Sequence, residues 1–344
     1  MRPTTSFFIV GLLAGLLGAC VLFAWIGQRE GAEPKKDSGR VLTVAHVLPT
    51  THPVHQGLEE FGRALEELSG GQLVAQIFPN EQLGNETELL EKTQQGSIDI
   101  TKSSAGPIGN FVSVFQVFSL PYLFRDGEHQ WRTLDGEIGQ ELLEAVATTD
   151  QGTSSGLVGL GYFDAGSRSF YTTRPVAQPS DLVGMKIRVQ QNPVAQDTVR
   201  AMGASAVAIS FGELYTSLKQ GGVDGAENNP PSFHSSRHFE VCPFYTLDRH
   251  STVPDVLVGS SALWESLSEI ERGWIREAVA RASDFQRRVW AEETEKTLAL
   301  LADAGITITE PDPDPFREAA APVIQKYATG ARAEYVKRIE ALTE

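Results

Sequence analysis

Cysteine is scarce in this chain of 344 residues, which contains only two. Cys20 lies in an apolar segment near the N-terminus, so Cys242 has no obvious partner in the folded body. A disulfide framework or a thiolate metal cluster is therefore excluded. We predict that Cys242 is a small side chain buried in the core.

Positive charge is scarce as well. Lysine and arginine together number 29, against 44 aspartate and glutamate residues, which gives a formal net charge of -15. A nucleic-acid partner is not expected, because its phosphates need a basic face. The net charge does not exclude a small anion as a ligand, because the local field of a site can oppose the net charge of the molecule.

The signatures of common enzyme classes are also missing. The chain has no phosphate-binding loop, Cys-x-x-Cys pair or dinucleotide fingerprint. Residues 152–156, "GTSSG", match the sequence motif of a nucleophile elbow, but the strand that this motif requires before the serine is missing. In "THPVH", His52 and His55 lie three residues apart at a helix start without a third ligand nearby, so capping or packing is favoured over metal binding. We expect no catalytic residue, cofactor or metal.

The N-terminal segment, residues 1–26, is predicted to export or anchor the protein. Its apolar run covers residues 7–26. "LGAC", which ends at Cys20, resembles a lipobox, in which the cysteine would be lipidated after cleavage. About twenty apolar residues can also span a bilayer as an uncleaved helix, and a plain cleaved signal peptide is the third reading. In each case residues 27–40 form a polar tether.

The body of the chain alternates between strand and helix patterns. Two β-α-β-α-β runs, from about residue 41 and from about residue 157, each imply a parallel sheet with covering helices. The length suits two such units. Apolar residues at spacings of three and four predict a long helix over 266–304 that could brace both units, and a final helix closes the chain. The fold class is therefore α/β.

Charged and amide residues mark the ends of the expected strands. Arg188 interrupts the strand "MKIRV", and Arg168 lies in "GSRSFYTTRP", where a solvated surface arginine is the simpler interpretation. Glu227, Asn228 and Asn229 follow an expected parallel strand, and ligands of open α/β sheets bind at such strand ends. Paired amides suit sugar hydroxyls, but a turn rich in asparagine and proline explains the segment equally well.

Four segments, taken together and in their order along the chain, indicate a protein family more specifically than any one of them does alone. They are "FPNEQLGNETELLE", "GSRSFYTTRP", "DLVGMKIRV" and "GASAVAISFGELYTSLKQGGVDGAENNPPS". From residue 41 to the C-terminus, and most specifically over 182–229, the chain resembles the solute-binding proteins of tripartite ATP-independent periplasmic (TRAP) transporters, of the DctP type. The resemblance implies a two-lobe fold of the periplasmic-binding-protein kind, with crossing strands and a long bracing helix. Lobe I would comprise 41–165 and 254–293, and lobe II 166–253 and 294–344.

The resemblance also implies a function. A periplasmic receptor would close its lobes on an organic acid and deliver it to the small and large membrane subunits, without catalysis. Arg188 would pair with the ligand carboxylate, and Arg168 matches the second arginine of the family. The other candidate ligand-binding residues are Glu86, Ser104, Gln190, Phe211, Asn228, Asn229 and His55.

The segment after Arg188 departs from the family pattern. Where the family often has proline, this chain reads "RVQQN", so Gln190 or Gln191 could contact ligand. With "ENN" and "GSRSFY", this resembles the branch that binds hexuronates, such as D-glucuronate or D-galacturonate. The alternatives are a receptor for a C4-dicarboxylate or other organic acid, a tethered sensor of the same fold, and an extracytoplasmic enzyme acting on acidic sugars.

Overall fold

The computed structural model of the protein describes residues 39–342. The predicted targeting segment, Cys20 and nearly all of the predicted tether lie outside these residues. Within residues 39–342, no helix is both long and apolar enough to cross a membrane. Cys242 is fully buried in an apolar cluster, as predicted.

The first sheet is built by five strands in the order β2-β1-β3-β10-β4. These are β1 (Arg40–Ala45), β2 (Leu73–Phe78), β3 (Ile100–Ser104), β4 (Leu157–Phe163) and β10 (Asp255–Ser260). β1 and β3 are parallel, but β10 lies antiparallel between β3 and β4. The expectation of a parallel sheet is therefore wrong for the side of the sheet that β10 and β4 form, because β10 comes from much later in the chain and inserts next to β3.

The second sheet has the order β11-β9-β5-β8-β6-β7. Its strands are β5 (Arg168–Thr172), β6 (Lys186–Val189), β7 (Ser205–Ala208), β8 (Gly225–Asn228), β9 (Phe244–Ser251) and β11 (Thr307–Thr309). β6 is parallel to β7 and β8, as predicted, whereas β5 is antiparallel to both of its neighbours. The fold is thus a mixed α/β arrangement of two sheets.

Helices cover both sheets. They are α2 (Pro53–Ser69), α3 (Glu86–Gln94), α4 (Ala105–Ile108), α5 (Gly127–Asp135), α6 (Glu137–Ala145), α7 (Pro193–Ala201), α8 (Phe211–Lys219), α9 (Pro230–Ser235), α10 (Ser261–Ser266), α11 (Glu269–Asp303), α12 (Asp314–Tyr327) and α13 (Ala331–Glu340). Short 3₁₀ helices are η1 (Ser113–Ser119), η2 (Pro179–Leu182) and η3 (His238–Glu240). The single final helix that was expected is two helices, separated at Gly330, whose φ of 54° is not helical.

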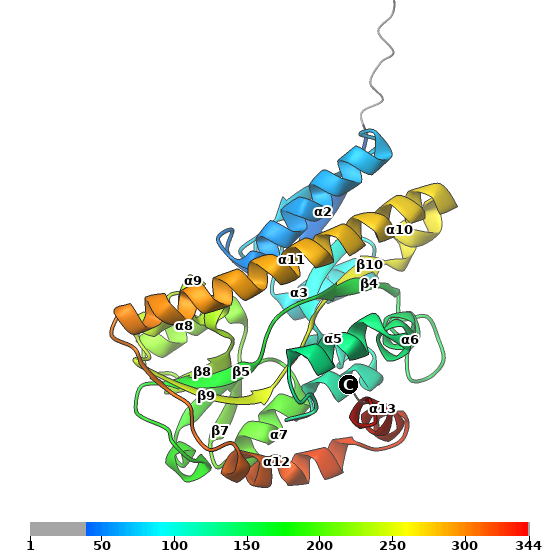
Figure 1. Cartoon of the computed structure of the whole chain (residues 1–344). Coiled ribbons are helices and arrows are strands. Elements are labelled where there is room, and N and C mark those ends of the chain that lie inside the picture. Colours follow the sequence, from blue (N-terminus) through cyan, green and yellow to red (C-terminus); the bar gives the residue numbers. More distant parts are fainter. Residues whose placement is uncertain (1–38, 343–344) are drawn as a thin grey trace, which may run out of the picture. The chain divides into compact units, whose positions relative to one another are not determined.

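Helix α11 links the two halves of the described chain. Its 35 residues rise about 50 Å at 1.5 Å per residue. It packs on α2 and β4 at one end and on α9 at the other (Figure 1). Gln286 of this helix exchanges two hydrogen bonds with the backbone of Asp164, at 2.8 and 2.9 Å, where the chain passes from β4 to β5. The long helix therefore braces a crossing between the sheets, although the exact lobe boundaries stay a prediction.

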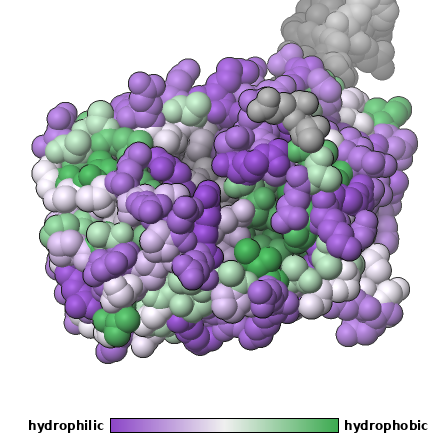
Figure 2. Space-filling view, turned by 60° about the horizontal axis from the view of Figure 1, so that its bottom comes forward, coloured by the Kyte–Doolittle hydropathy of each residue, from purple (hydrophilic) through white to green (hydrophobic). Residues whose placement is uncertain are grey.

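Apolar residues on the surface form only small, scattered groups on the face that Figure 2 draws. Polar and apolar side chains are interspersed in small patches on the face shown in Figure 2. Among the described residues, the large apolar side chains that are clearly exposed are Val41, Val183, Ile270 and Leu300. Scattered exposure of this kind is normal for a folded domain.

A candidate ligand-binding cleft between the two sheets

A polar cavity lies between the two sheets. The cavity proper has a volume of about 30 Å³ and lies in a hollow of about 420 Å³ that includes open solvent. The lining residues are Val47, Leu48, His52, Glu86, Lys102, Ser104, Ala165, Arg168, Arg188, Gln190, Phe211, Asn228, Asn229, Ser232 and Asp255. Eight of the nine predicted ligand-binding residues are among them, drawn from segments up to about 140 residues apart in the chain. His55 is not.

Strand ends and helix starts bring these side chains together. Ser104 ends β3 and Asn228 ends β8, while Gln190 directly follows β6. Glu86 is the first residue of α3 and Phe211 the first residue of α8. The partially positive N-termini of these two helices therefore border the cavity, where they favour an anion or a carboxylate.

Arg188 is the one guanidinium of the cavity that has no carboxylate partner within residues 39–342. Its side chain is only 3% exposed, and its Nε donates a 3.0 Å hydrogen bond to the carbonyl oxygen of Ile209. The guanidinium carbon lies 5.7 Å from the centre of the Phe211 ring. Burial lowers the pKa of Arg188 below its ordinary value. Its two Nη groups are thus available to donate hydrogen bonds to a ligand.

Arg168, by contrast, is already paired. Its Nε and Nη2 donate to the carboxylate of Glu227, and its Nη1 donates to Asn228 Oδ1 at 2.9 Å. Burial alone would raise the pKa of Glu227, but Arg168 and His250 outweigh it and lower the pKa to about 2. The side chain is 6% exposed, so the interpretation of Arg168 as a solvated surface arginine is wrong. Glu227 balances its charge, and one Nη1 hydrogen stays available to a ligand.

A further histidine extends this ion pair. His250 Nε2 lies 3.7 Å from Glu227 Oε2, and its Nδ1 lies 2.8 Å from Asp248 Oδ2. Burial would lower the pKa of His250, but Asp248 and Glu227 raise it to about 9. The imidazole is therefore a cation at neutral pH, and the four groups form a row of alternating charges beneath Asn228.

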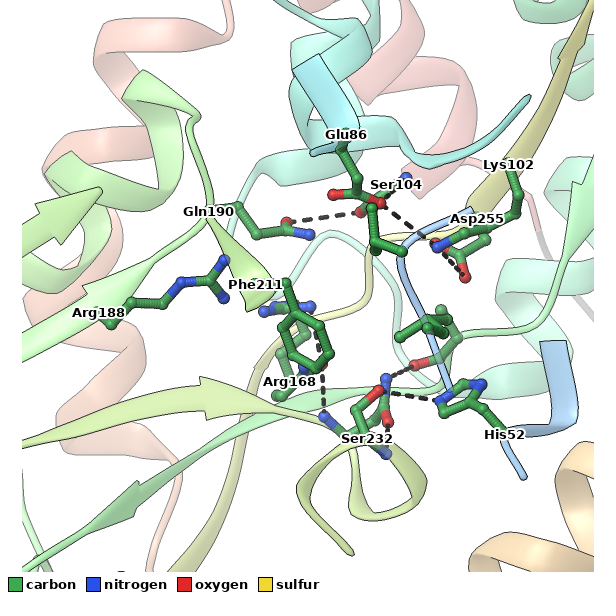
Figure 3. A pocket seen from close by; sticks show the side chains of 15 residues that line it. His52, Glu86, Lys102, Ser104, Arg168, Arg188, Gln190, Phe211, Ser232 and Asp255 are labelled. Carbon is green, nitrogen blue, oxygen red and sulfur yellow. Dashed lines mark hydrogen bonds and ion pairs between the residues drawn. The ribbon is translucent and has the colours of Figure 1, made fainter. Parts of the chain in front are cut away.

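The opposite end of the cavity is acidic. Lys102 Nζ lies 3.1 Å from Asp255 Oδ2 and 3.4 Å from Glu86 Oε1, which also accepts the Ser104 N–H at 3.0 Å. Burial opposes the charge of Lys102, but the two carboxylates outweigh it and raise its pKa. In Figure 3 this group lies across the pocket from Arg188. Sequence reasoning missed Lys102, in the middle of β3, and Asp255, the first residue of β10.

The amide residues differ in what they offer. Ser104 Oγ donates to Gln190 Oε1 at 3.5 Å, which joins the two sides of the cleft. Asn228 Oδ1 accepts hydrogen bonds from Arg168 and from the Asn229 N–H, so its amide nitrogen is the free donor. Asn229 caps α9 through the Ser232 N–H and donates to the Ala165 carbonyl oxygen at 3.0 Å. Asn229 thus lines the cavity while its amide serves the local structure.

The two histidines of "THPVH" differ in position, because His52 lines the cavity and His55 does not. His52 caps α2 by accepting the Val54 N–H at 3.2 Å, and its Nε2 lies 3.1 Å from Ser232 Oγ. Burial lowers its pKa to about 3, so it is neutral. His55 lies outside the cavity lining, with its Nδ1 2.9 Å from His46 Nε2. Across residues 39–342, no three or more histidine, cysteine or acidic side chains are placed to hold a metal ion.

The sequence as a whole places the protein in a family. Residues 44–330 match the family DctP, described as bacterial extracellular solute-binding protein, family 7. The chain belongs to this family. A solute-binding protein of Chromohalobacter salexigens is 37% identical over 78% of this chain and 78% of its own. The C4-dicarboxylate-binding periplasmic protein DctP of Rhodobacter capsulatus is 29% identical over 96% of this chain and 98% of its own.

Solved structures of TRAP periplasmic solute-binding proteins share the fold. A TRAP periplasmic solute-binding protein from Pseudomonas putida, with bound D-glucuronate, aligns with a TM-score of 0.85 and 35% identity over 89% of this chain and 98% of its own. One from Xanthobacter autotrophicus, with bound β-D-galacturonate, gives 0.84 and 33% over 88% and 100%. The predicted two-sheet α/β receptor fold is confirmed. DctP-family members are extracytoplasmic solute receptors, not a class of enzymes.

Proposed function

We propose that this protein is the periplasmic receptor of a TRAP transporter and binds a sugar acid, D-glucuronate or D-galacturonate. The observation that carries the proposal is Arg188, a buried guanidinium that faces the cavity without an ion-pair partner among residues 39–342. A buried, unpaired charge is costly, so such a group is kept where a ligand supplies the counter-charge. The rigid fork of a guanidinium matches the two oxygens of a carboxylate.

The far end of the cavity favours a sugar acid over a dicarboxylate. Glu86 and Asp255 surround the single cation Lys102, so no unpaired positive charge is left there. A second ligand carboxylate would find no cation to pair with, whereas sugar hydroxyls can donate to the carboxylate oxygens. Gln190 and the free amide of Asn228 add further hydrogen-bonding groups. The bound glucuronate and galacturonate of the two structural relatives support the same ligand class.

The remaining parts of the proposal follow from the family. The two halves would close on the ligand as lobes, and the loaded receptor would dock on the small and large membrane subunits. The receptor would release its ligand chemically unchanged, which separates it from an enzyme acting on acidic sugars. It would stay near the membrane through a lipidated Cys20 or an uncleaved N-terminal helix, or be free after simple cleavage. The mass of the mature N-terminus distinguishes these three forms.

A ligand panel tests the proposed function. Uronates, C4-dicarboxylates and aromatic acids are compared by thermal shift and calorimetry, and we expect uronates alone to raise the melting temperature. A ligand at 1,000 times its Kd adds about 4 kcal/mol of stability. Arg188→Met should lose this response yet be more stable than the wild type without ligand, by about 1–3 kcal/mol, because it removes an unpaired buried charge.

Lys186→Met is the matched control. Lys186 lies on the same strand, two residues from Arg188, but is exposed. Its replacement should leave uronate binding intact. A dicarboxylate or aromatic acid that stabilises the protein where uronates do not would overturn the ligand class. A uronate response that survives in Arg188→Met would overturn the role of Arg188.

A further inference from the structure

A helix on one side of the cleft is capped from the other side. Glu81 follows β2 of the first sheet, and Gly212 is the second residue of α8, which packs with the second sheet. Glu81 Oε1 accepts the Gly212 N–H at 2.8 Å. Ser210, at the usual capping position of α8, makes no side-chain cap bond. A distant carboxylate thus supplies the cap that the local sequence does not.

The backbone conformation on both sides of the cleft allows the contact between Glu81 and Gly212. Asn80 and Glu81 both adopt left-handed conformations, with φ of 56° and 57°, which non-glycine residues rarely do. The Asn80 N–H donates to the Leu48 carbonyl oxygen at 3.0 Å, which holds the turn. A Cβ atom at Gly212 would lie 2.3 Å from Glu81 Oε2. The missing side chain at Gly212 therefore allows the carboxylate to approach.

The cap and the proposed carboxylate anchor meet on one short segment. Ile209 accepts the hydrogen bond of Arg188 Nε, and Phe211 stacks beside the same guanidinium. Gly212, one residue further, donates to Glu81. Residues 209–212 therefore connect the anchor in the cavity to a contact that bridges the cleft.

Gln191 adds a second bridge at the same edge. Thr87 Oγ1 donates to Gln191 Oε1 at 2.6 Å, and Asn110 Nδ2 donates to the Gln191 carbonyl oxygen at 2.6 Å. Thr87 and Asn110 flank the first sheet, whereas Gln191 follows β6 of the second. Separation of the two halves would have to break these bonds together with the cap on α8.

We propose that Glu81 is a positioning residue that holds the cleft closed over its ligand, by capping α8 in a closed state that the ligand-free protein also adopts. A carboxylate at a helix N-terminus is favourable, and opening would return both the carboxylate and the N–H group to water. The effect should appear mainly in ligand release, because the cap must break before the closed cleft can open. The ligand readout rests on the proposed receptor function, but the contact itself does not.

A double-mutant cycle with D-glucuronate tests the contact from both sides. Glu81→Ala and Gly212→Ala should each raise the dissociation rate about tenfold, the size expected for the loss of a helix cap, with little change in association rate. Gly212→Ala should add almost nothing in the Glu81→Ala background, because the added methyl no longer meets a carboxylate. Glu213→Ala removes a neighbouring acid of α8 whose charge repels Glu81, so this control should not raise the dissociation rate. Additive effects of the two substitutions, or wild-type rates in both, would overturn the proposal.

Hydrogen exchange separates this proposal from the ligand assignment. The amides at the start of α8 should exchange about tenfold faster in ligand-free Glu81→Ala than in the wild type or Glu213→Ala, with the melting temperature nearly unchanged. If D-glucuronate fails to bind the wild type, the receptor proposal fails for that sugar. The exchange rates would still show whether Glu81 caps α8. Equal exchange in all three proteins would refute the cap.

Discussion

Four buried ionisable residues behind the cavity decide the charge state of the site. Arg168, Glu227, His250 and Asp248 alternate in sign, and each is at most 6% exposed. Glu227 is held ionised with a pKa of about 2, and His250 is held protonated with a pKa of about 9. A row in which each charge is paired with its neighbour avoids most of the cost of burial. Arg168 and Asn228 are thereby oriented toward the cavity before any ligand arrives.

This row predicts a pH dependence of stability. Because the pKa of His250 is raised from 6.5 to about 9, its contribution is complete below pH 6.5 and is lost as the pH rises through 9. The free energy of unfolding should fall by up to about 3 kcal/mol over this range. Urea unfolding at pH 6.5 and 9 measures it.

Two histidine variants make the attribution specific. His250→Gln should lose most of the fall between pH 6.5 and 9. His234→Gln, which replaces a partly exposed histidine, should keep the wild-type slope. A slope that is the same in all three proteins would show that another group titrates in this range.

At the scale of elements, two helices cross so closely that one position must be glycine. Gly57 of α2 is buried against α11, where an added Cβ would lie 2.8 Å from Gln286 and from Phe163. The same Gln286 holds the backbone of Asp164 between β4 and β5. The α2–α11 contact therefore sets the position of the crossing strand that begins with Arg168.

Gly57→Ala should consequently destabilise the protein, although alanine is the better helix former. We expect a loss of about 1–3 kcal/mol from overpacking, measured by urea unfolding. Gly273→Ala in α11 is the control, because nothing lies within 4 Å of its added methyl. That variant should gain about 0.5–1 kcal/mol from helix propensity. A stabilised Gly57→Ala protein would mean that the two helices can move apart freely.

At the scale of the whole molecule, an acidic protein is proposed to capture an anion. The net charge of -15 repels a uronate at long range, while Arg188, which lines the cleft, is proposed to attract it at short range. Salt screens the first interaction more than the second, because buried charges are less exposed to counterions. Affinity and encounter rate are therefore expected to depend on salt in different ways.

The association rate should rise with salt. Between about 10 and 150 mM salt, screening shortens the reach of the net charge from about 30 to 8 Å, and we expect association of D-glucuronate to speed up several-fold. The dissociation rate should change much less. Stopped-flow mixing across this range measures both rates, and an association rate that falls with salt would show that a local positive field guides the ligand instead.

Much of this protein could be predicted from the sequence because the deciding signals are local. The spacing of apolar residues predicted α11 almost to its ends. Asn85 caps α3 and Pro193 begins α7, at positions that these residue types favour. The motif around Arg188 resembled a known family, and Arg188, the proposed carboxylate anchor, does line the cavity. These features depend on a residue and its near neighbours in the chain.

Tertiary structure alone decided which distant residues meet. β10 enters the first sheet antiparallel and brings Asp255 to Lys102, while β5 and β8 bring Arg168 to Glu227. Glu81 reaches Gly212 across 131 positions of the chain. A periodic pattern specifies which face of an element is buried, but not which side chain from another part of the chain lies against it. That choice follows from strand order and helix packing, which also turned Arg168 from an apparent surface residue into part of the cavity wall.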